Sequence, residues 1–159
     1  FTKTCISGII EEVIPLIESN AEVKKVHINV DMQKDIPMVN ADRESIRQVI
    51  INIVLNGIDV LHENGRMNIS IWYDQINELV KMEFKDNGDG IKPEYLDKIF
   101  EPFFTTKENG TGLGLAISRK IIEGHYGKLF AFNNYEGGAT FVIELPAAAR
   151  YATNDDKVS

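Results

Sequence analysis

Two pairs of short segments in which apolar and polar residues alternate constrain the fold most strongly. Residues 67–73 and 80–84 form the first pair, and residues 128–133 and 139–145 form the second. Alternation with a period of two predicts half-buried strands. Each pair is joined by a short connection that contains Asp, Asn or Gly, and such connections link neighbouring antiparallel strands. The chain is therefore expected to contain two β-hairpins.

Three other segments have the apolar spacing of helices. Residues 6–23 carry such a stripe but include Pro15, which lacks a backbone donor and is expected to kink or split the helix. Further helices are expected over residues 42–62, which begin with a suitable N-cap, and over residues 113–126. A short strand is expected over residues 27–32. Helices combined with antiparallel hairpins favour a two-layer α+β sandwich over a doubly wound parallel sheet.

The composition limits the classes of partner and compartment. The 159 residues suit one domain, and the net charge of −7 at pH 7 comes without any Lys- or Arg-rich run. We therefore expect neither nucleic acid nor an anionic membrane as the main partner. The single Cys5 provides no disulfide framework and no thiolate zinc site.

The ends of the chain and its apolar runs bear on localisation. No apolar run reaches the ~18 residues of a membrane span, and no signal peptide is visible. The chain begins at Phe1 without a Met, which indicates a piece of a longer protein. We expect a cytoplasmic domain, whether or not the parent protein is anchored in a membrane.

The helix over residues 42–62 carries a polar stripe on an otherwise apolar segment. Asn52 and Asn56 lie one turn apart in this stripe, although asparagine is a mediocre helix former. A solvated helix face more often carries Glu, Lys and Arg, which favour helix. Amide groups one turn apart can donate, accept, and offer oxygen to a hard cation such as Mg²⁺. A solvated face and a ligand-binding face both remain open on this feature alone.

Glycine-bearing segments lie on both sides of the helix expected over residues 113–126. Asp86–Ile91 (DNGDGI) is either a strand-ending turn or a place where backbone approaches a planar ligand beside one carboxylate. Gly110, Gly112 and Gly114 lead into a helix and create an anion site from free N–H groups. Their spacing is neither a Walker motif nor a dinucleotide-binding fingerprint, and protein-kinase catalytic-loop signatures are absent. Gly137–Phe141 (GGATF) alone is most simply a turn that leads into a strand.

In this order, the motifs resemble the N, G1, F, G2 and G3 boxes of the ATP-binding domain of histidine kinases. The motifs are Asn-x-x-x-Asn, Asp-x-Gly-x-Gly, Phe-x-x-Phe-Phe, Gly-x-Gly-x-Gly and Gly-Gly-x-Thr, within residues 42–145. The spelling Glu-Pro-Phe-Phe-Thr-Thr-Lys is similar to kinases of the nitrogen-regulatory and sporulation type. The domain belongs to the GHKL superfamily with the Bergerat fold. The resemblance implies a mixed, mostly antiparallel sheet covered on one face by three helices, with a mobile ATP lid.

The resemblance also implies roles for individual residues. Asp86 would bind adenine, directly and through a water shared with Thr140. Asn56 would ligate Mg²⁺, while Asn52 and Lys107 would be the catalytic residues. The base pocket would be shaped by Gly88, Gly90 and Ile91. The residues expected to close over the triphosphate are Thr106, Lys107, Gly110, Thr111, Gly112, Leu113, Gly114 and Leu115, with Asn52 beside them. The residues expected to anchor the lid are Phe100, Phe103 and Phe104.

Asn52 indicates which member of the superfamily the chain resembles. The ATP hydrolases and serine kinases of the superfamily carry a glutamate at this position as general base. An amide cannot accept a proton near neutral pH, so phosphoryl transfer to histidine is favoured over hydrolysis. The alternatives are a catalytically silent nucleotide-binding regulatory module and, less favoured, an ATP-hydrolysing clamp. Two departures are Gly57, where alanine is usual, and Asp59, where many relatives carry a lysine for phosphate; Arg119 or Lys120 could then assist Lys107.

The acceptor histidine is expected outside this chain. In the family it lies on a separate dimerisation domain, whereas His27, His62 and His125 occupy positions that suit structural or solvated side chains. We therefore expect residues 1–146 to form the catalytic domain, with 147–159 as a frayed tail and no dimerisation domain in this piece. The expected partners are that dimerisation domain and a response regulator. The parent would be homodimeric and the isolated domain monomeric.

Overall fold

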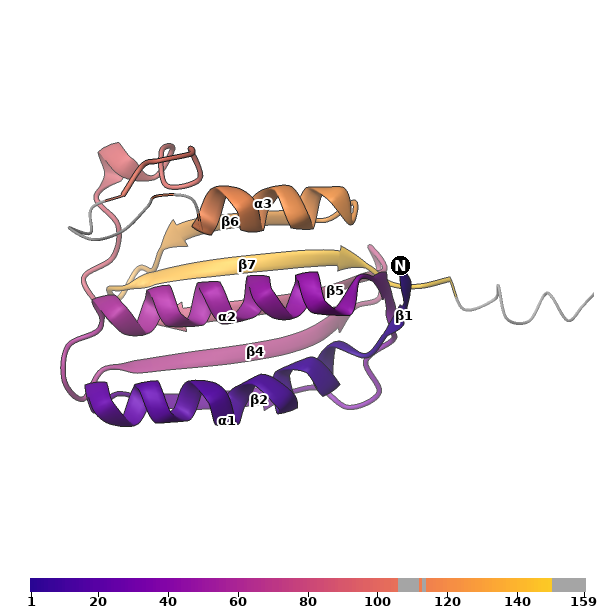
Figure 1. Cartoon of the computed structure of the whole chain (residues 1–159), viewed down its shortest axis with the longest axis horizontal. Helices are drawn as coiled ribbons and strands as arrows, with labels where there is room; N and C mark the ends of the chain where they lie inside the picture. The colour runs from indigo at the N-terminus through magenta and orange to yellow at the C-terminus, as the bar shows by residue number, and fades with distance from the viewer. Residues whose placement is uncertain (106–111, 113, 150–159) are drawn as a thin grey trace, which may run out of the picture.

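In a computed structural model of the chain, three helices pack on one face of a five-stranded sheet (Figure 1). The structure describes residues 1–105, 112 and 114–149. The elements, in chain order, are β1 (Thr2–Thr4), α1 (Ile6–Lys24), β2 (His27–Met32), β3 (Val39–Ala41), α2 (Arg43–Val60), β4 (Arg66–Asp74), β5 (Leu79–Asp86), the short 3-10 helix η1 (Pro93–Tyr95), α3 (Gly114–Gly124), β6 (Lys128–Asn133) and β7 (Ala139–Pro146). The predicted α+β sandwich is confirmed.

The sheet has the strand order β2-β4-β5-β7-β6. Only the β2–β4 pair is parallel; the pairs β4–β5, β5–β7 and β6–β7 are antiparallel. Both predicted hairpins are therefore confirmed. The register aligns Ile69 with Phe84 and Phe84 with Phe141, so the apolar residues of three central strands share one face.

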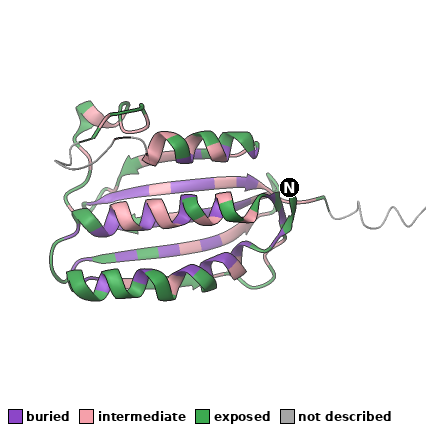
Figure 2. Cartoon of the chain, in the orientation of Figure 1, coloured by how far each residue is buried: buried purple, intermediate pink, exposed green. Residues whose placement is uncertain are grey.

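The core lies between this sheet face and the helices. Val49, Ile50 and Phe84 are fully buried, together with Ile9 and Ile10 of α1. Figure 2 shows the central strand β7 as mostly buried, while the outward side of α1 is mostly exposed. This is the pattern expected when an amphipathic helix covers a half-apolar sheet. Among the described residues, no helix is both long and apolar enough to span a bilayer.

Pro15 does not split the first helix. It lies inside α1, which is assigned as one continuous helix from Ile6 to Lys24. Pro15 is exposed, and so is Glu11, the residue whose carbonyl loses its usual donor. Water can satisfy that carbonyl, while the buried side chains of Val13 and Ile17 hold the opposite face on the sheet. Of the two expected effects, a kink or a split, the split was wrong because the defect falls on the solvent side.

A second, two-stranded sheet was not predicted. Thr2–Thr4 pairs antiparallel with Val39–Ala41, and the three-residue strands are too short to show alternation. The pairing also extends past Pro146, where a loose tail was expected: the N–H of Ala147 donates to Glu78 O, and that of Ala148 to Met38 O. The last ten residues of that expected tail lie outside the described residues.

Candidate nucleotide-binding site

A cavity of about 540 Å³ opens where α2 ends, α3 begins and the chain leaves β5. Figure 1 shows that these three parts meet at one end of the sheet. A volume of this size suits a small organic ligand. The described lining consists of Asn52, Asn56, Gly57, Val60, Asp86, Gly90, Ile91, Lys92, Tyr95, Ile99, Phe104, Thr105, Gly112, Gly114, Leu115, Ala139 and Phe141. Eight of the predicted site residues are thus gathered around one cavity: Asn52, Asn56, Asp86, Gly90, Ile91, Gly112, Gly114 and Leu115.

Asp86 is the most deeply buried carboxylate of the cavity, with 6% of its surface exposed. One oxygen, Oδ1, accepts hydrogen bonds from the N–H of Gly88 at 2.9 Å and of Ala139 at 3.1 Å. Burial raises the pKa of Asp86 above its usual range, and these two N–H donors partly offset the shift. Since the donors both bind Oδ1, Oδ2 can accept from a donor in the cavity.

Asn52 connects the two helices that border the cavity. Its amide nitrogen donates to Ser118 Oγ of α3 at 3.2 Å, and Ser118 is almost fully buried. A Cβ added to Gly114 would lie 2.8 Å from Asn52 Oδ1, so any larger residue at the start of α3 would displace the Asn52 side chain. The N-box asparagine and the glycine-rich motif therefore meet directly, as the sequence could not show.

Asn56 is half-buried and lines the cavity one turn after Asn52. Its amide oxygen fits the preference of Mg²⁺ for oxygen ligands. In the described part of the chain, no group of three or more His, Cys, Asp or Glu side chains could hold a metal by itself. Mg²⁺ bound through Asn56 would therefore need phosphate and water oxygens for the rest of its coordination, as is common for this ion.

The aromatic residues expected to anchor the lid divide into packed and exposed ones. The Phe100 ring lies 6.2 Å from Phe141, edge to face, and the Phe104 ring lies 5.2 Å from Tyr95. Phe103 is 75% exposed, but its N–H donates to Gly112 O at 2.8 Å. This hydrogen bond joins the two sides of the segment before α3.

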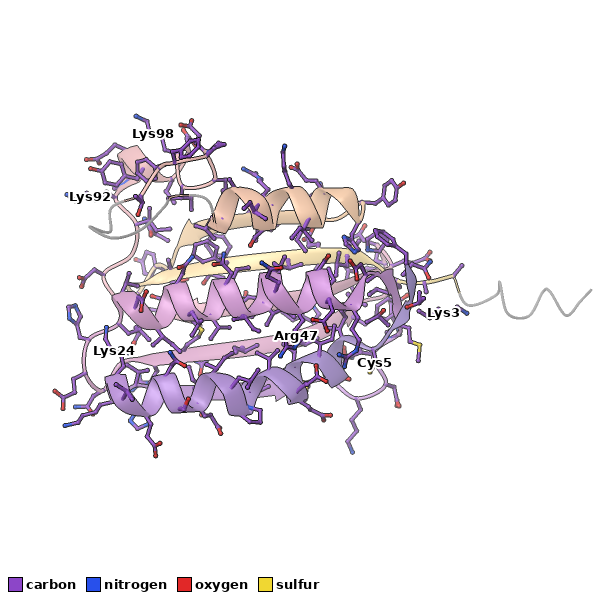
Figure 3. The ribbon with its side chains drawn as sticks, viewed as in Figure 1. Lys3, Cys5, Lys24, Arg47, Lys92 and Lys98 are labelled. Carbon is purple, nitrogen blue, oxygen red and sulfur yellow. The ribbon has the colours of Figure 1, made fainter. Side chains whose placement is uncertain are left out.

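The described cations near the cavity differ from those expected. Lys92 lines it, with Nζ 5.8 Å from the centre of the Tyr95 ring, and sequence reasoning missed it. Figure 3 shows Lys92 and Lys98 on the segment that follows β5. Arg119, which was expected to assist with phosphate, lies over the Phe100 ring at 4.4 Å and pairs with Glu123 at 3.7 Å.

Two predicted base-pocket residues, Thr140 and Gly88, do not line the cavity directly. Thr140 is not among the described lining residues; it is 1% exposed, and its hydroxyl donates to Asn134 Oδ1. Its neighbour Ala139 lines the cavity and holds Asp86, because strand residues alternate between faces. Gly88 does not line the cavity either, but its N–H binds Asp86 Oδ1. The predicted residues Thr106, Lys107, Gly110, Thr111 and Leu113 lie outside the described residues.

None of the three histidines lines this cavity. His125 is buried; its Nε2 accepts from the N–H of Asp42 at 3.0 Å, which leaves Nδ1 to donate to Ile121 O at 2.7 Å. Its ring stacks on Phe1. His62 Nε2 lies 3.2 Å from each carboxylate oxygen of Asp89 at the surface, and His27 is exposed. All three therefore have the structural or solvated positions expected.

The sequence is similar to known ATPase domains along most of its length. Residues 41–149 match the family described as histidine kinase-, DNA gyrase B-, and HSP90-like ATPase. The chain is 36% identical over 145 residues to the signal transduction histidine-protein kinase AtoS of Escherichia coli, covering 91% of this chain and 24% of AtoS. It is 37% identical over 138 residues to sporulation kinase A of Bacillus subtilis, covering 87% of this chain and 22% of that kinase. The chain thus spans about a quarter of the length of these curated relatives.

The fold is similar to solved histidine-kinase structures. The catalytic domain of histidine kinase ThkA matches with a TM-score of 0.82 and 38% identity, covering 92% of this chain and 95% of that chain. ThkA in complex with the response regulator protein TrrA matches with a TM-score of 0.80 and 35% identity, covering 93% of this chain and 42% of that chain.

Proposed function

Because the chain belongs to the histidine kinase-, DNA gyrase B-, and HSP90-like ATPase family, with the fold of a histidine-kinase catalytic domain, we propose that it binds Mg-ATP and donates the γ-phosphoryl group to a histidine. That histidine would lie on the dimerisation domain of the parent protein. A response-regulator aspartate would receive the phosphoryl group next. The parent would be a homodimer, with residues 1–146 as its catalytic domain, while the isolated domain would be a monomer.

The arrangement of Asp86 is the observation that carries this proposal. A buried carboxylate is costly unless it finds donors, and two backbone N–H groups satisfy only Oδ1. The exocyclic amine of adenine can supply the missing donor to Oδ2. Gly90 and Ile91 border the same cavity and give the flat base a close approach to the backbone. Ala139 would be the β7 residue beside the base, and Thr140 would contribute through a water shared with Asp86.

The phosphate end of the proposed site lies between α2 and the start of α3. Asn56 would hold Mg²⁺, which neutralises charge on phosphate oxygens. Asn52 would face the phosphates from the adjacent turn, oriented by Ser118. The free N–H groups at the start of α3 favour anions there. We also propose that Lys107 and its neighbours in the glycine-rich motif bind the triphosphate, with Lys92 as a described cation at the rim.

Asn52 favours transfer to histidine over hydrolysis. A phosphoryl transfer needs positioning and charge neutralisation more than covalent help from the protein. A neutral imidazole is already a nucleophile, whereas water or a serine hydroxyl requires a general base, which an amide cannot be. The relatives AtoS and ThkA are named as histidine kinases, which supports the same assignment.

The test combines binding and transfer. Calorimetry should detect Mg-ATP binding by the isolated domain. Mixed with the dimerisation domain of its own parent, the domain should place acid-labile, base-stable phosphate from labelled ATP on that partner. Normal binding without transfer would indicate the regulatory-module alternative. Appreciable ATP turnover by the isolated domain would indicate the hydrolysing clamp instead.

A further inference from the structure

Two asparagines at the end of β6 contact the loop that would hold the base, although they do not line the cavity themselves. Asn133 and Asn134 precede the β6–β7 turn, and Figure 1 shows this turn at the same end of the sheet as the segment that follows β5. Neither residue lines the cavity among the described residues, and neither belongs to the five sequence motifs. Their side chains nevertheless bind both ends of the loop from Asp86 to Ile91.

Asn133 binds the far end of that loop through both functions of its amide. Its Oδ1 accepts the N–H of Ile91 at 2.8 Å, and its Nδ2 donates to Ile91 O at 2.7 Å. The side chain thus pairs with one residue's backbone much as a neighbouring strand would. Gly90 fits beneath this contact, because an added Cβ would lie 2.9 Å from Asn133 Oδ1. Both Gly90 and Ile91 line the cavity.

Asn134 binds the near end. Its Nδ2 donates to the carbonyl oxygens of Asp86 at 3.0 Å and Gly137 at 3.2 Å, while its Oδ1 accepts the Thr140 hydroxyl. The backbone of Asp86 is therefore attached to the hairpin by Asn134, and its carboxylate is attached to the same hairpin by the N–H of Ala139.

We propose that Asn133 and Asn134 are positioning residues for base recognition, which fix Ile91 and the Asp86 carboxylate relative to each other. The inference rests on the proposed binding of ATP in this cavity. Asn133 is exposed, so water can replace its bonds and its contribution to global stability is small. Its contribution to a preorganised pocket is larger, because a loose loop must be ordered when the base binds.

The test separates base recognition from phosphate binding and from folding. Calorimetry would compare ATP, GTP and inorganic triphosphate on wild type, Asn133→Ala and Asn134→Ala. Asn77→Ala is the matched control, since Asn77 also hydrogen-bonds within a hairpin, to Asp74 at the opposite end of the sheet. Each test variant should weaken ATP binding about tenfold, equivalent to two modest hydrogen bonds, and lower the preference for ATP over GTP. Triphosphate affinity should change no more than in the control for either variant. The urea midpoint should also match the control for Asn133→Ala, whereas Asn134→Ala should lower it, because the buried Thr140 hydroxyl loses its acceptor.

Hydrogen exchange provides a measurement that does not depend on any variant. The Ile91 amide of the nucleotide-free wild type should be protected, because Asn133 accepts its hydrogen. An unprotected Ile91 amide, or variants with an unchanged ATP-to-GTP preference, would overturn the positioning role while ATP binding by the wild type stood. Equal losses for ATP and triphosphate would indicate a merely structural role. A wild type that fails to bind ATP would overturn the proposed function as well.

Discussion

Replacing Asp86 by asparagine changes the charge of the buried carboxyl while keeping its shape. In Asp86→Asn the new Oδ1 can still accept from Gly88 and Ala139, so the loop should keep its conformation. The amide nitrogen then takes the place of Oδ2 and presents a donor to the donor amine of adenine. The variant therefore isolates the polarity of the proposed base contact.

The expected loss of affinity follows from two terms. A hydrogen bond to a charged group contributes about 1.5–3 kcal/mol, and a buried donor left without an acceptor costs about 1–3 kcal/mol. Together these terms amount to at least about 2.5 kcal/mol and weaken ATP binding by at least about 60-fold, since each 1.4 kcal/mol is a factor of ten. Guanine carries an acceptor where adenine carries the amine, so the ratio of GTP to ATP affinity should rise.

Calorimetry with Mg-ATP and Mg-GTP measures both quantities. Asp74→Asn is the matched control, because Asp74 lies in the β4–β5 hairpin and accepts from Asn77 rather than facing the cavity. Its ATP affinity should equal that of the wild type. If Asp86→Asn folds normally and binds ATP with unchanged affinity, the base does not contact Asp86 and the pocket assignment is wrong.

For the same two variants, the stability relative to the wild type should change with pH in opposite directions. Because burial raises the pKa of Asp86, its contribution to the stability of the nucleotide-free domain is full below the unfolded-state pKa and is lost as the pH rises through the folded-state value. Hydrogen bonds from the Asn77 side chain and backbone, and then from Lys81, lower the pKa of Asp74, whose contribution is lost as the pH falls. In urea unfolding, the stability of Asp86→Asn relative to the wild type should therefore increase as the pH rises. The stability of Asp74→Asn relative to the wild type should decrease as the pH rises. If the relative stability of both variants changed with pH in the same direction, the opposite pKa shifts of Asp86 and Asp74 would be contradicted.

Three further substitutions test the packing around the site and the proline in α1. Gly138→Ala should lower the free energy of unfolding by about 2–4 kcal/mol, because φ is +89° and the new Cβ would overlap Asp86 O; circular dichroism during urea unfolding measures this. Ser118→Ala should cost about 1 kcal/mol of stability and also weaken Mg-ATP binding, since Asn52 loses its anchor; unchanged affinity in calorimetry would exclude the anchoring role. Pro15→Ala should raise the free energy of unfolding by about 1–3 kcal/mol, because it restores a helical donor; a lower melting temperature would show that the proline fits α1 better than alanine.

The parts of the fold with a strong period could be predicted from the sequence. Strands β4 and β5 alternate along their whole length, and turn residues separate them, so pattern and topology agree. The N-terminal strand Thr2–Thr4 could not be predicted, because three residues show no period and its partner Val39–Ala41 is distant in sequence. A split at Pro15 was expected from the proline alone, although Pro15 lies outside the apolar stripe and its missing donor therefore falls on the solvent side.

The candidate site could be predicted by motif, but the sequence did not show which residues of each motif line the cavity. Around GGAT, alternation along β7 places Ala139 and Phe141 at the cavity. A shift of one residue exchanges the two faces of a strand, and the pairing of β7 with β5 and β6 fixes the register. The sequence indicated no role for Asn133 and Asn134, because hydrogen bonds to a loop more than forty positions away leave no local signal.

The glycine that follows Asn56 has a consequence for sequences other than this one. A Cβ on Gly57 would overlap the end of the Met67 side chain, so the methionine fills the space that a methyl group would need. Positions 57 and 67 therefore share one volume between α2 and β4. In an alignment of relatives they should covary, with alanine at 57 accompanied by a shorter side chain at 67. The departure from the usual alanine would then be half of a compensated pair.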